Sequence, residues 1–192
     1  MTSTSEQGAR RVGPYTVVYS EPKYENLWVK VREDRVKDRR GEEAIFTVIA
    51  AKPTVTVLPI DDDNEVYLVR RFKYAIGEPS LEAINGAIES GETPEQAGLR
   101  EIGEEADLVA AEWVDMGLIN PLTSIVDSPS HTFLARKLST IRRSAEPDQT
   151  LEVVKASFAD ALEWVLDGTI THGASCALIL KTHILLERAS RR

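Results

Sequence analysis

Apolar and polar residues alternate in the first quarter of the chain, which is the pattern of half-buried β-strands. The alternation covers residues 15–20 (YTVVYS), 27–34 (LWVKVRED) and 43–50 (EAIFTVIA), and polar turns separate the three segments. It predicts a three-stranded antiparallel unit. Because so small a sheet cannot bury its apolar residues by itself, we expect it to pack on the main domain or on a second subunit.

A second group of apolar segments predicts the main sheet. Residues 52–60 and 65–72 flank the polar turn 61–64, so they are expected to pair as a hairpin. Residues 72–86 are interrupted by glycine and proline and are expected to form a loop. Three later segments are expected to add strands: residues 112–119, 130–138 and 151–158.

Three further segments carry helix signals. Thr93 and Gln96 form a capping box around Pro94, which stands at the first helical position, where its missing N–H costs nothing. Ser157 caps a second helix, and residues 174–189 predict a third. The chain has no internal repeat, so we expect one mixed domain of helices and strands with an N-terminal extension.

The helix that begins after Thr93 has two contrasting faces at about 100° per residue. Its apolar face is expected to carry three residues: Leu99, Ile102 and Ala106. Glu101, Glu104 and Glu105 gather on the opposite side, where like charges three and four residues apart destabilise a helix by a few tenths of a kcal/mol per pair. A hard divalent cation such as magnesium, which prefers oxygen ligands, would compensate; the alternative is a solvated acidic face.

The segment that contains these glutamates resembles the Nudix box. That motif consists of a glycine, five residues, a glutamate, seven residues, and then Arg-Glu-aliphatic-x-Glu-Glu-x-Gly-aliphatic. The matching positions here are Gly86, Glu92, Arg100, Glu101, Ile102, Glu104, Glu105 and Leu108. One fixed position departs: Asp107 replaces the last glycine, at a place that usually ends the helix in the left-handed conformation, which aspartate tolerates.

From about residue 15 to 186 the chain is similar to the ADP-ribose and nucleotide-sugar pyrophosphatase branch of that family. This resemblance implies an α+β Nudix fold, a mixed-sheet α/β/α sandwich with an N-terminal antiparallel β extension. With the polar composition of the first residues and the strand pattern, it divides the chain into a disordered tail (1–12), an extension for dimerisation (13–51) and the hydrolase domain (52–192). The substrate loops depart from the branch, since Ala83, Ile84 and Asn85 stand where it has Leu-Pro-Ala.

The implied activity is metal-dependent hydrolysis of the pyrophosphate bond of a nucleoside diphosphate linked to a sugar, with nucleoside monophosphate and sugar phosphate as products. ADP-ribose and nucleotide sugars are the implied substrates. Because the substrate loops depart from the branch, two alternatives stay open. One is hydrolysis of another nucleotide, such as a dinucleoside polyphosphate, and the other is an inactive Nudix-fold module that only binds nucleotides.

The resemblance also implies a metal site with Mg²⁺, or alternatively Mn²⁺, at which a water is activated to attack phosphorus. Its implied ligands are Glu101, Glu105 and Glu104, with help from Glu82 and the Asn85 carbonyl. Arg100 would orient the glutamates with Glu92 as its partner, or form only a structural salt bridge. Asp127 is the candidate general base; a box glutamate taking that role, or Asp127 capping a turn, are the alternatives.

Substrate contacts are expected from the extension and from the strand before the box. The resemblance implies that Trp28, on an N-terminal strand, stacks the adenine base, sometimes across a dimer; a core or interface tryptophan is the alternative. Arg70, Arg71 and Lys73 could meet phosphates, with at least one of them a surface charge. The branch implies a homodimer in which the extension joins the two subunits.

Composition narrows the partners further. A formal net charge of −8 argues against a nucleic-acid partner and favours a small substrate that needs bound metal. The single cysteine, Cys176, excludes an internal disulfide, and no segment is long and apolar enough to predict a membrane span or a signal peptide. We therefore expect a cytoplasmic protein without a membrane partner.

Overall fold

The structure, a computed structural model, describes residues 10–141 and 150–191 of the chain. The described residues form two compact units, which are considered separately below. The first contains the residues up to Lys52 together with 122–128, and the second contains the remainder. None of the helices in the described part of the chain has both the length and the apolar content needed to cross a membrane.

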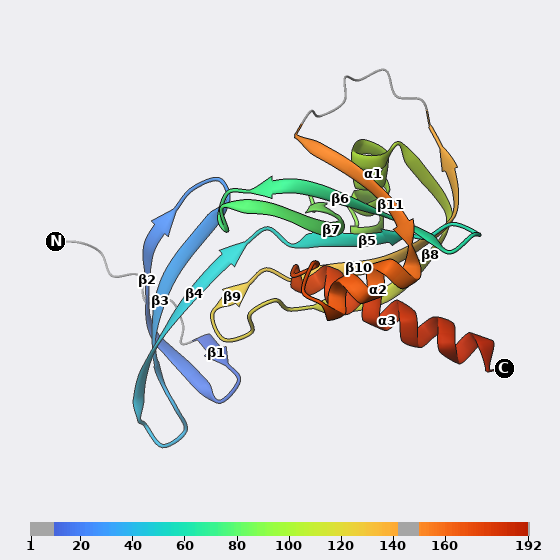
Figure 1. Ribbon diagram of the computed structural model, residues 1–192. Helices are drawn as coiled ribbons and strands as arrows, with labels where there is room; N and C mark the ends of the chain where they lie inside the picture. Colours follow the sequence, from blue (N-terminus) through green and yellow to red (C-terminus); the bar gives the residue numbers. More distant parts are fainter. Residues whose placement is uncertain (1–9, 142–149, 192) are drawn as a thin grey trace. The chain divides into compact units, whose positions relative to one another are not determined.

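The first unit is a five-stranded sheet in the order β1-β2-β3-β4-β9 (Figure 1). Its strands are β1 (Arg10–Val12), β2 (Tyr15–Glu25), β3 (Val29–Lys37), β4 (Glu43–Ala51) and β9 (Val126–Asp127). The antiparallel pairing predicted for the first three segments is confirmed in β2, β3 and β4. Two short strands extend it, β1 antiparallel and β9 parallel to their neighbours. Residues 10–12, expected in the disordered tail, thus form a strand, whereas residues 1–9 lie outside the described residues.

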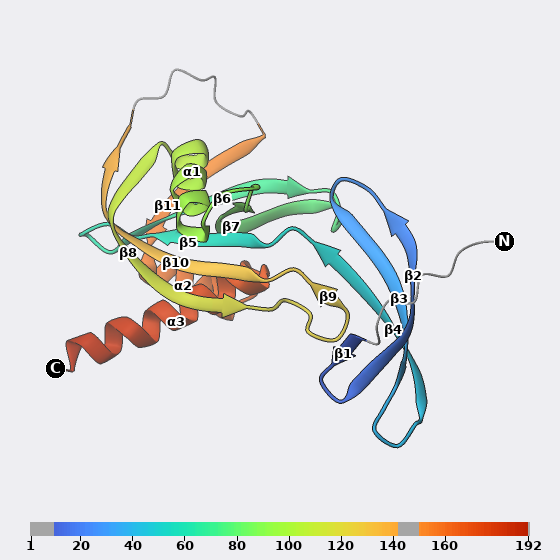
Figure 2. The same cartoon turned by 180° about the vertical axis from the view of Figure 1, so that it is seen from behind.

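The second unit is a six-stranded mixed sheet in the order β11-β6-β7-β5-β10-β8. Its strands are β5 (Thr54–Pro59), β6 (Glu65–Lys73), β7 (Glu78–Ala87), β8 (Leu108–Ile119), β10 (Ser130–Thr140) and β11 (Leu151–Ser157). Neighbours are antiparallel except β5 and β10, which run parallel. Helix α1 (Pro94–Ala106) covers one face, and α2 (Phe158–Leu166) and α3 (Gly173–Ser190) cover the other (Figures 1 and 2). The predicted α+β class and α/β/α layering are confirmed.

Two apolar clusters fill the spaces between these layers. Consecutive residues of one strand enter opposite clusters, because side chains alternate across a sheet. In β5, Val57 packs under α1 while Leu58 packs under α2 and α3, and Val69 and Leu68 of β6 divide in the same way. The glutamate-bearing helix is therefore anchored to one face of the sheet by a core of its own.

The hairpin predicted for residues 52–60 and 65–72 is wrong, as is the loop predicted for residues 72–86. Strand β7 inserts between β5 and β6 and pairs with both, which leaves only the isolated bridge between Ile60 and Val66. The residues of β7 from 80 to 84 are buried whichever face they point to, so the segment lacks the alternation by which a strand is recognised.

Candidate active site

Helix α1 starts and packs as its sequence requires. The Thr93 hydroxyl accepts from the Gln96 N–H at 3.2 Å, and the Gln96 side chain accepts from the Thr93 N–H at 2.8 Å, so the predicted capping box is present. In the middle of the helix, a Cβ on Gly98 would lie 3.1 Å from both Val57 and Trp113. The absence of a side chain at Gly98 therefore lets α1 approach the sheet closely and sets the depth of its glutamates.

Of the apolar face predicted for α1, Ile102 and Ala106 pack in the core, but Leu99 does not. Leu99 is exposed, whereas Gly98, Glu101 and Ile102 are buried, and the side chain of Glu105 is only 7% exposed. These buried positions follow the spacing i, i+3, i+4 and i+7, which is one stripe of a helix. Two of the three clustered glutamates thus face inward, which rules out a fully solvated acidic face.

Gly86 of β7 lies directly beneath Glu101. A Cβ on Gly86 would lie 1.9 Å from Glu101 Oε1 and 2.1 Å from its Cδ, so any side chain there would displace the carboxylate. This close approach accounts for a glycine at the first position of the box. Burial raises the pKa of Glu101, and the contacts from Arg100 oppose that effect.

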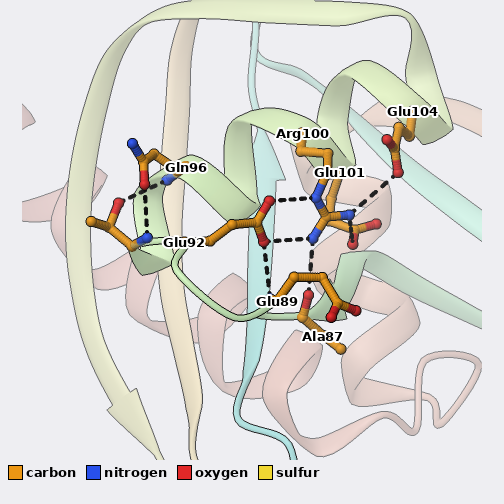
Figure 3. Close-up of polar contacts among 8 residues, drawn as sticks. Ala87, Glu89, Glu92, Gln96, Arg100, Glu101 and Glu104 are labelled. Carbon is orange, nitrogen blue, oxygen red and sulfur yellow. Dashed lines mark hydrogen bonds and ion pairs between the residues drawn. The ribbon is translucent and has the colours of Figure 1, made fainter.

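Arg100 is held by a dense set of acceptors (Figure 3). Its Nε and Nη2 donate to the two oxygens of Glu92 at 2.8 and 3.0 Å, and Nη2 also donates to the Ala87 carbonyl at 2.9 Å. Nη1 donates to Glu101 Oε1 at 2.6 Å and to Glu104 Oε2 at 3.3 Å. Hydrogen bonds from Arg100 lower the pKa of Glu92 to about 2, so that carboxylate stays ionised at neutral pH.

Glu105 meets a second cation, Arg71 of β6. Arg71 Nη2 lies 2.9 Å from Glu105 Oε1, while Glu105 Oε2 is buried and has no hydrogen-bond partner among the described residues. Burial raises the pKa of the Glu105 carboxyl to about 7, although the charge of Arg71 opposes the shift. This carboxylate is consequently less well stabilised by its surroundings than Glu101 or Glu92.

Glu82, in the centre of β7, is surrounded by donors. Lys73 Nζ lies 2.9 Å and Asn85 Nδ2 lies 2.8 Å from Glu82 Oε2, and His172 Nδ1 lies 3.8 Å from the same oxygen. Burial acts to raise the pKa of Glu82, but hydrogen bonding from Lys73 and the neighbouring charges outweigh it and leave the pKa below its usual range. Helix α1 and strands β6 and β7 thus bring Glu82, Arg71, Lys73 and the box glutamates to one face of the unit.

The family of this chain follows from comparison with known proteins. The sequence model of one family, described as the NUDIX domain, matches residues 50–166, which is more than half of the chain. The chain belongs to the Nudix family. The matched segment includes every residue of the described cluster except His172, so the resemblance carried by the box is confirmed.

Two of the proteins to which this Nudix hydrolase is similar in sequence are named as pyrophosphatases of ADP compounds. It is 30% identical to an ADP-ribose pyrophosphatase of Bacillus subtilis (strain 168), over 65% of this chain and 69% of the relative. It is also 30% identical to an ADP-sugar pyrophosphatase of Mus musculus, over 64% of this chain and 65% of that protein. The crystal structure of an ADP compounds hydrolase has a TM-score of 0.80 and 16% identity and covers 96% of this chain and 100% of its own, which shows the shared fold.

Not every similar protein is a pyrophosphatase by name. A methanol dehydrogenase activator of Bacillus methanolicus is 23% identical over 74% of this chain and 78% of its own length. Similarity in sequence is therefore shared among proteins with different names.

The donor set of the Nudix box fits a hard divalent cation. Carboxylate oxygens are the ligands that magnesium prefers, and the buried Glu105 Oε2, without a hydrogen-bond partner in the described residues, is an acceptor left to be satisfied. Among the residues that the structure describes, no three acidic, histidine or cysteine side chains converge closely enough to hold a metal as they stand. The carboxylates are instead divided among Arg100, Arg71 and Lys73, so a metal at Glu105 or Glu82 would require Arg71 or Lys73 to move.

The remaining predicted residues lie elsewhere. Arg70 is next to Arg71 in sequence but points to the other face of β6, where its Nη1 lies 2.9 Å from Glu152 of β11. Trp28 and Asp127 belong to the first unit. Asp127 is exposed on β9, and Trp28 is 67% exposed, which excludes a core position for it.

Trp28 also departs from the strand that was predicted for it. It lies in the turn between β2 and β3, where the side chain of Asn26 accepts from the N–H groups of Trp28 and Val29 at 2.8 Å each. An asparagine that bonds its own downstream backbone forms a turn, which explains why the strand is interrupted here. Within the same unit, Lys52 Nζ lies 5.8 Å from the centre of the Trp28 ring.

One residue of the cluster was not predicted from the sequence. His172, the N-cap residue of α3, approaches Glu82 and lies 2.8 Å from the Ser175 hydroxyl, which accepts from the Ala83 N–H of β7 at 2.8 Å. The histidines show no metal-ligand spacing, so their sequence positions carried no signal. Only the packing of α3 against β7 brings His172 to the site.

Proposed function

We propose that this Nudix hydrolase is a metal-dependent pyrophosphatase that cleaves a nucleoside diphosphate linked to a sugar into nucleoside monophosphate and sugar phosphate. The observation that carries the proposal is the pair of buried carboxylates, Glu101 and Glu105, on one stripe of α1 beside the cationic side chains of β6. The names of the ADP-ribose and ADP-sugar pyrophosphatases that the chain resembles support the same substrate class.

The metal ligands in this proposal are Glu101, Glu104 and Glu105, with Glu82 and the Asn85 carbonyl beside them. Magnesium is the proposed ion and manganese the alternative, because both are hard cations that favour oxygen donors. When bound, such an ion polarises phosphoryl oxygens and lowers the pKa of a water molecule. Arg100 is a positioning residue in this proposal, because it holds Glu101 and Glu104 from a fixed point on Glu92 and the backbone.

Arg71 and Lys73 are the proposed phosphate contacts. They are two residues apart in β6, so their side chains point to the same face of the sheet. These side chains are 34% and 33% exposed, so each can reach an anion from the solvent side. We propose no substrate contact for Arg70, since it faces away from them and pairs with Glu152.

The proton acceptor in this proposal is Asp127, with a box glutamate as the alternative. Asp127 is exposed on β9, so its carboxylate is open to a water molecule, whereas Glu101 and Glu105 are buried. The variant Asp127→Asn should lower kcat by about 10²-fold if it takes the proton. Turnover within about twofold of the unchanged protein would transfer the role to a glutamate of α1.

The first unit is proposed to join two copies of the chain. The unit exposes several large apolar side chains on its strands and in the turn between β2 and β3: Val18, Tyr19, Tyr24, Leu27, Trp28 and Ile45. Large apolar side chains exposed on so small a unit favour an interaction surface, and a second copy of the same unit matches it in chemistry. Light scattering should give about twice the 21.3 kDa chain mass, and Ile45→Asp should halve it. A monomeric unchanged protein would refute the dimer.

Substrate class is decided by one comparison of rates. The purified protein with Mg²⁺ is offered ADP-ribose, ADP-sugars, other nucleotide sugars and dinucleoside polyphosphates, and kcat/KM is measured for each. Hydrolysis of the first two groups above the last supports the proposal, and Glu105→Gln should abolish it while leaving the fold intact. Preference for dinucleoside polyphosphates would move the enzyme to another substrate class. A nucleotide-induced rise in Tm without any product would identify a binding module instead.

We also propose a cytoplasmic location, on the basis of a single half-buried cysteine whose thiol donates to the Ile170 carbonyl. Labelling of the protein in fractionated cells tests this directly, and recovery with an exported fraction would contradict it.

A further inference from the structure

Two cations of β6 hold two different carboxylates of the site. Arg71 reaches Glu105 of α1 at 2.9 Å, and Lys73 reaches Glu82 of β7 at 2.9 Å. The carboxylates are only 7% and 6% exposed, whereas the cationic side chains are about one-third exposed. Each pair therefore joins an acceptor fixed in the interior to a donor that extends from the solvent side.

These pairs differ from the one that Arg100 makes. Arg100 uses its three guanidinium nitrogens, spans both oxygens of Glu92 and bonds a backbone carbonyl, so both oxygens of the Glu92 carboxylate have a partner. Arg71 instead approaches a single oxygen of Glu105, and Glu105 Oε2 is buried without a hydrogen-bond partner in the described part of the chain. A guanidinium can satisfy both oxygens of a carboxylate, and here it does not.

A cation of higher charge density would satisfy Glu105 better than Arg71 does. Divalent ions bind carboxylates through either or both oxygens, and the second oxygen of Glu105 is available for this. Arg71 and Lys73 would then face an added positive charge at short range and would be repelled toward solvent. Their stems are anchored in β6, so the released ends would stay beside the site.

We propose that Arg71 and Lys73 are exchangeable counter-ions: a divalent cation at Glu105 and Glu82 displaces them, and the displaced ends then bind the phosphates of the substrate. This rests on the metal site of the proposed function. Metal binding thereby creates the phosphate-binding groups, so metal and substrate bind with positive coupling. Because such coupling is reciprocal, the substrate raises the affinity for metal by the same factor.

The test measures Mg²⁺ affinity without substrate, by calorimetric titration at about pH 9, where the Glu105 carboxyl is ionised. Arg71→Met removes a competitor for Glu105, so the Kd for Mg²⁺ should fall about two- to fivefold, the range expected for losing one partly exposed ion pair. Lys73→Met should act in the same direction through Glu82. Arg70→Met is the matched control, because Arg70 pairs with Glu152 on the other face, and it should leave the Kd unchanged.

The second measurement is the affinity for a substrate analogue, which Arg71→Met should lower rather than raise. A methylene-bridged ADP analogue, which cannot be hydrolysed between its phosphorus atoms, should bind Arg71→Met at least about threefold more weakly when Mg²⁺ is saturating, because a phosphate contact is lost. Tighter metal binding together with weaker analogue binding supports the exchange. Unchanged Mg²⁺ affinity in Arg71→Met overturns it, and so does a fall in both affinities, which would mean that Arg71 only supports the fold.

A spectroscopic test uses the unchanged protein and so does not depend on a variant that folds. In a ¹⁵N spectrum of the arginine side chains, Mg²⁺ should shift the Nε signal of Arg71 and leave that of Arg100 in place. If neither signal moves although calorimetry detects Mg²⁺, the exchange is wrong while the metal site stands. If the unchanged protein binds neither Mg²⁺ nor Mn²⁺, the proposed function fails as well.

Discussion

The two arginines of the site, Arg100 and Arg71, show that the same charge can be part of the scaffold or be replaceable. Arg100 satisfies Glu92 with two nitrogens and is tied to the Ala87 carbonyl, whereas Arg71 meets one oxygen of Glu105. Each arginine also contacts one oxygen of a buried carboxylate of α1, Glu101 for Arg100 and Glu105 for Arg71, so burial does not distinguish them. The added contact of Arg100 with both oxygens of Glu92 does, because a guanidinium that spans two oxygens of one carboxylate is held in one position.

The largest effect that would sharpen this comparison is the response of Glu105 to pH. Its carboxyl has a pKa of about 7 in the folded chain and 4.5 as the ordinary value, so the folded state favours the protonated form. The stability that Glu105 contributes is therefore complete below pH 4.5 and is lost as pH rises through 7. A pKa difference of this size corresponds to about 3 kcal/mol.

Urea unfolding in EDTA measures this at about pH 5 and about pH 8, on either side of the folded pKa. Between these two pH values the free energy of unfolding of the unchanged protein should fall by about 2.5 kcal/mol relative to Glu105→Gln, which has no proton to lose. Glu104→Gln is the control for losing a carboxylate from α1, because the Glu104 side chain lies on the exposed side of the helix. Parallel pH profiles for all three proteins would mean that Arg71 neutralises Glu105 as fully as Arg100 neutralises Glu92.

Moving Glu101 away from Arg100 should have the next largest effect. Gly86→Ala places a Cβ 1.9 Å from Glu101 Oε1, so the carboxylate must leave its position between Gly86 and Arg100. A misplacement of about 1 Å in a catalytic group costs roughly 10²-fold in rate, and kcat should fall by about that much. Gly103→Ala is the control, since its nearest neighbours are 3.7 Å away, and activity close to that of the unchanged protein is expected. Full activity of Gly86→Ala would show that the position of Glu101 is not limiting.

Replacing each arginine by lysine compares the two pairs directly. Lysine keeps the charge but loses the planar fork, so Arg100→Lys should lower the free energy of unfolding by about 1–3 kcal/mol. Arg71→Lys should cost less than about 1 kcal/mol, because its ion pair with Glu105 is partly exposed and a lysine can replace it. Urea unfolding at about pH 8 without metal, where Glu105 is ionised, gives both values. Equal losses would remove the distinction between a scaffold arginine and a replaceable one.

The parts of the fold that could be predicted from the sequence are those with a local signal. The capping box of Thr93, the strands β2 to β4 and the end of α1 at Asp107 follow from short-range chemistry, and all are present. Strand β7 was missed because burial on both faces removes the alternation, and its placement between β5 and β6 is a long-range choice. Turn residues in the sequence indicated that β5 and β6 are connected, but they could not exclude a strand between them.

The residues of the site also divide into those with a local signal in the sequence and those that only long-range packing brings together. The box glutamates and Arg100 were predictable because one helix and its preceding loop hold them at fixed spacing. His172 joins them only because α3 packs on β7, and Arg71 separates from Arg70 only because β6 has two faces. What the sequence lacks in both cases is the identity of the neighbouring element.

The smallest expected effect comes from Asp107, the one departure from the box. It lies at the C-terminal end of α1, the helix that carries Glu101 and Glu105. Its φ of 55° and ψ of 35° place it in the left-handed region, and its N–H donates to the Ile102 carbonyl. Asp107→Gly removes the steric cost of that conformation and a negative charge from the helix C-terminus, so it should raise stability by about 0.5–1.5 kcal/mol, and the Tm by a few degrees. Asp107→Asn removes the charge alone and should give the smaller part of the gain, which separates the two causes.

Both variants should keep kcat/KM within about twofold, because Arg100 and Arg71, rather than the helix end, position the glutamates. A large change in kcat/KM would instead show that Asp107 acts on the site, and the comparison of the two arginines would then have to include a third group.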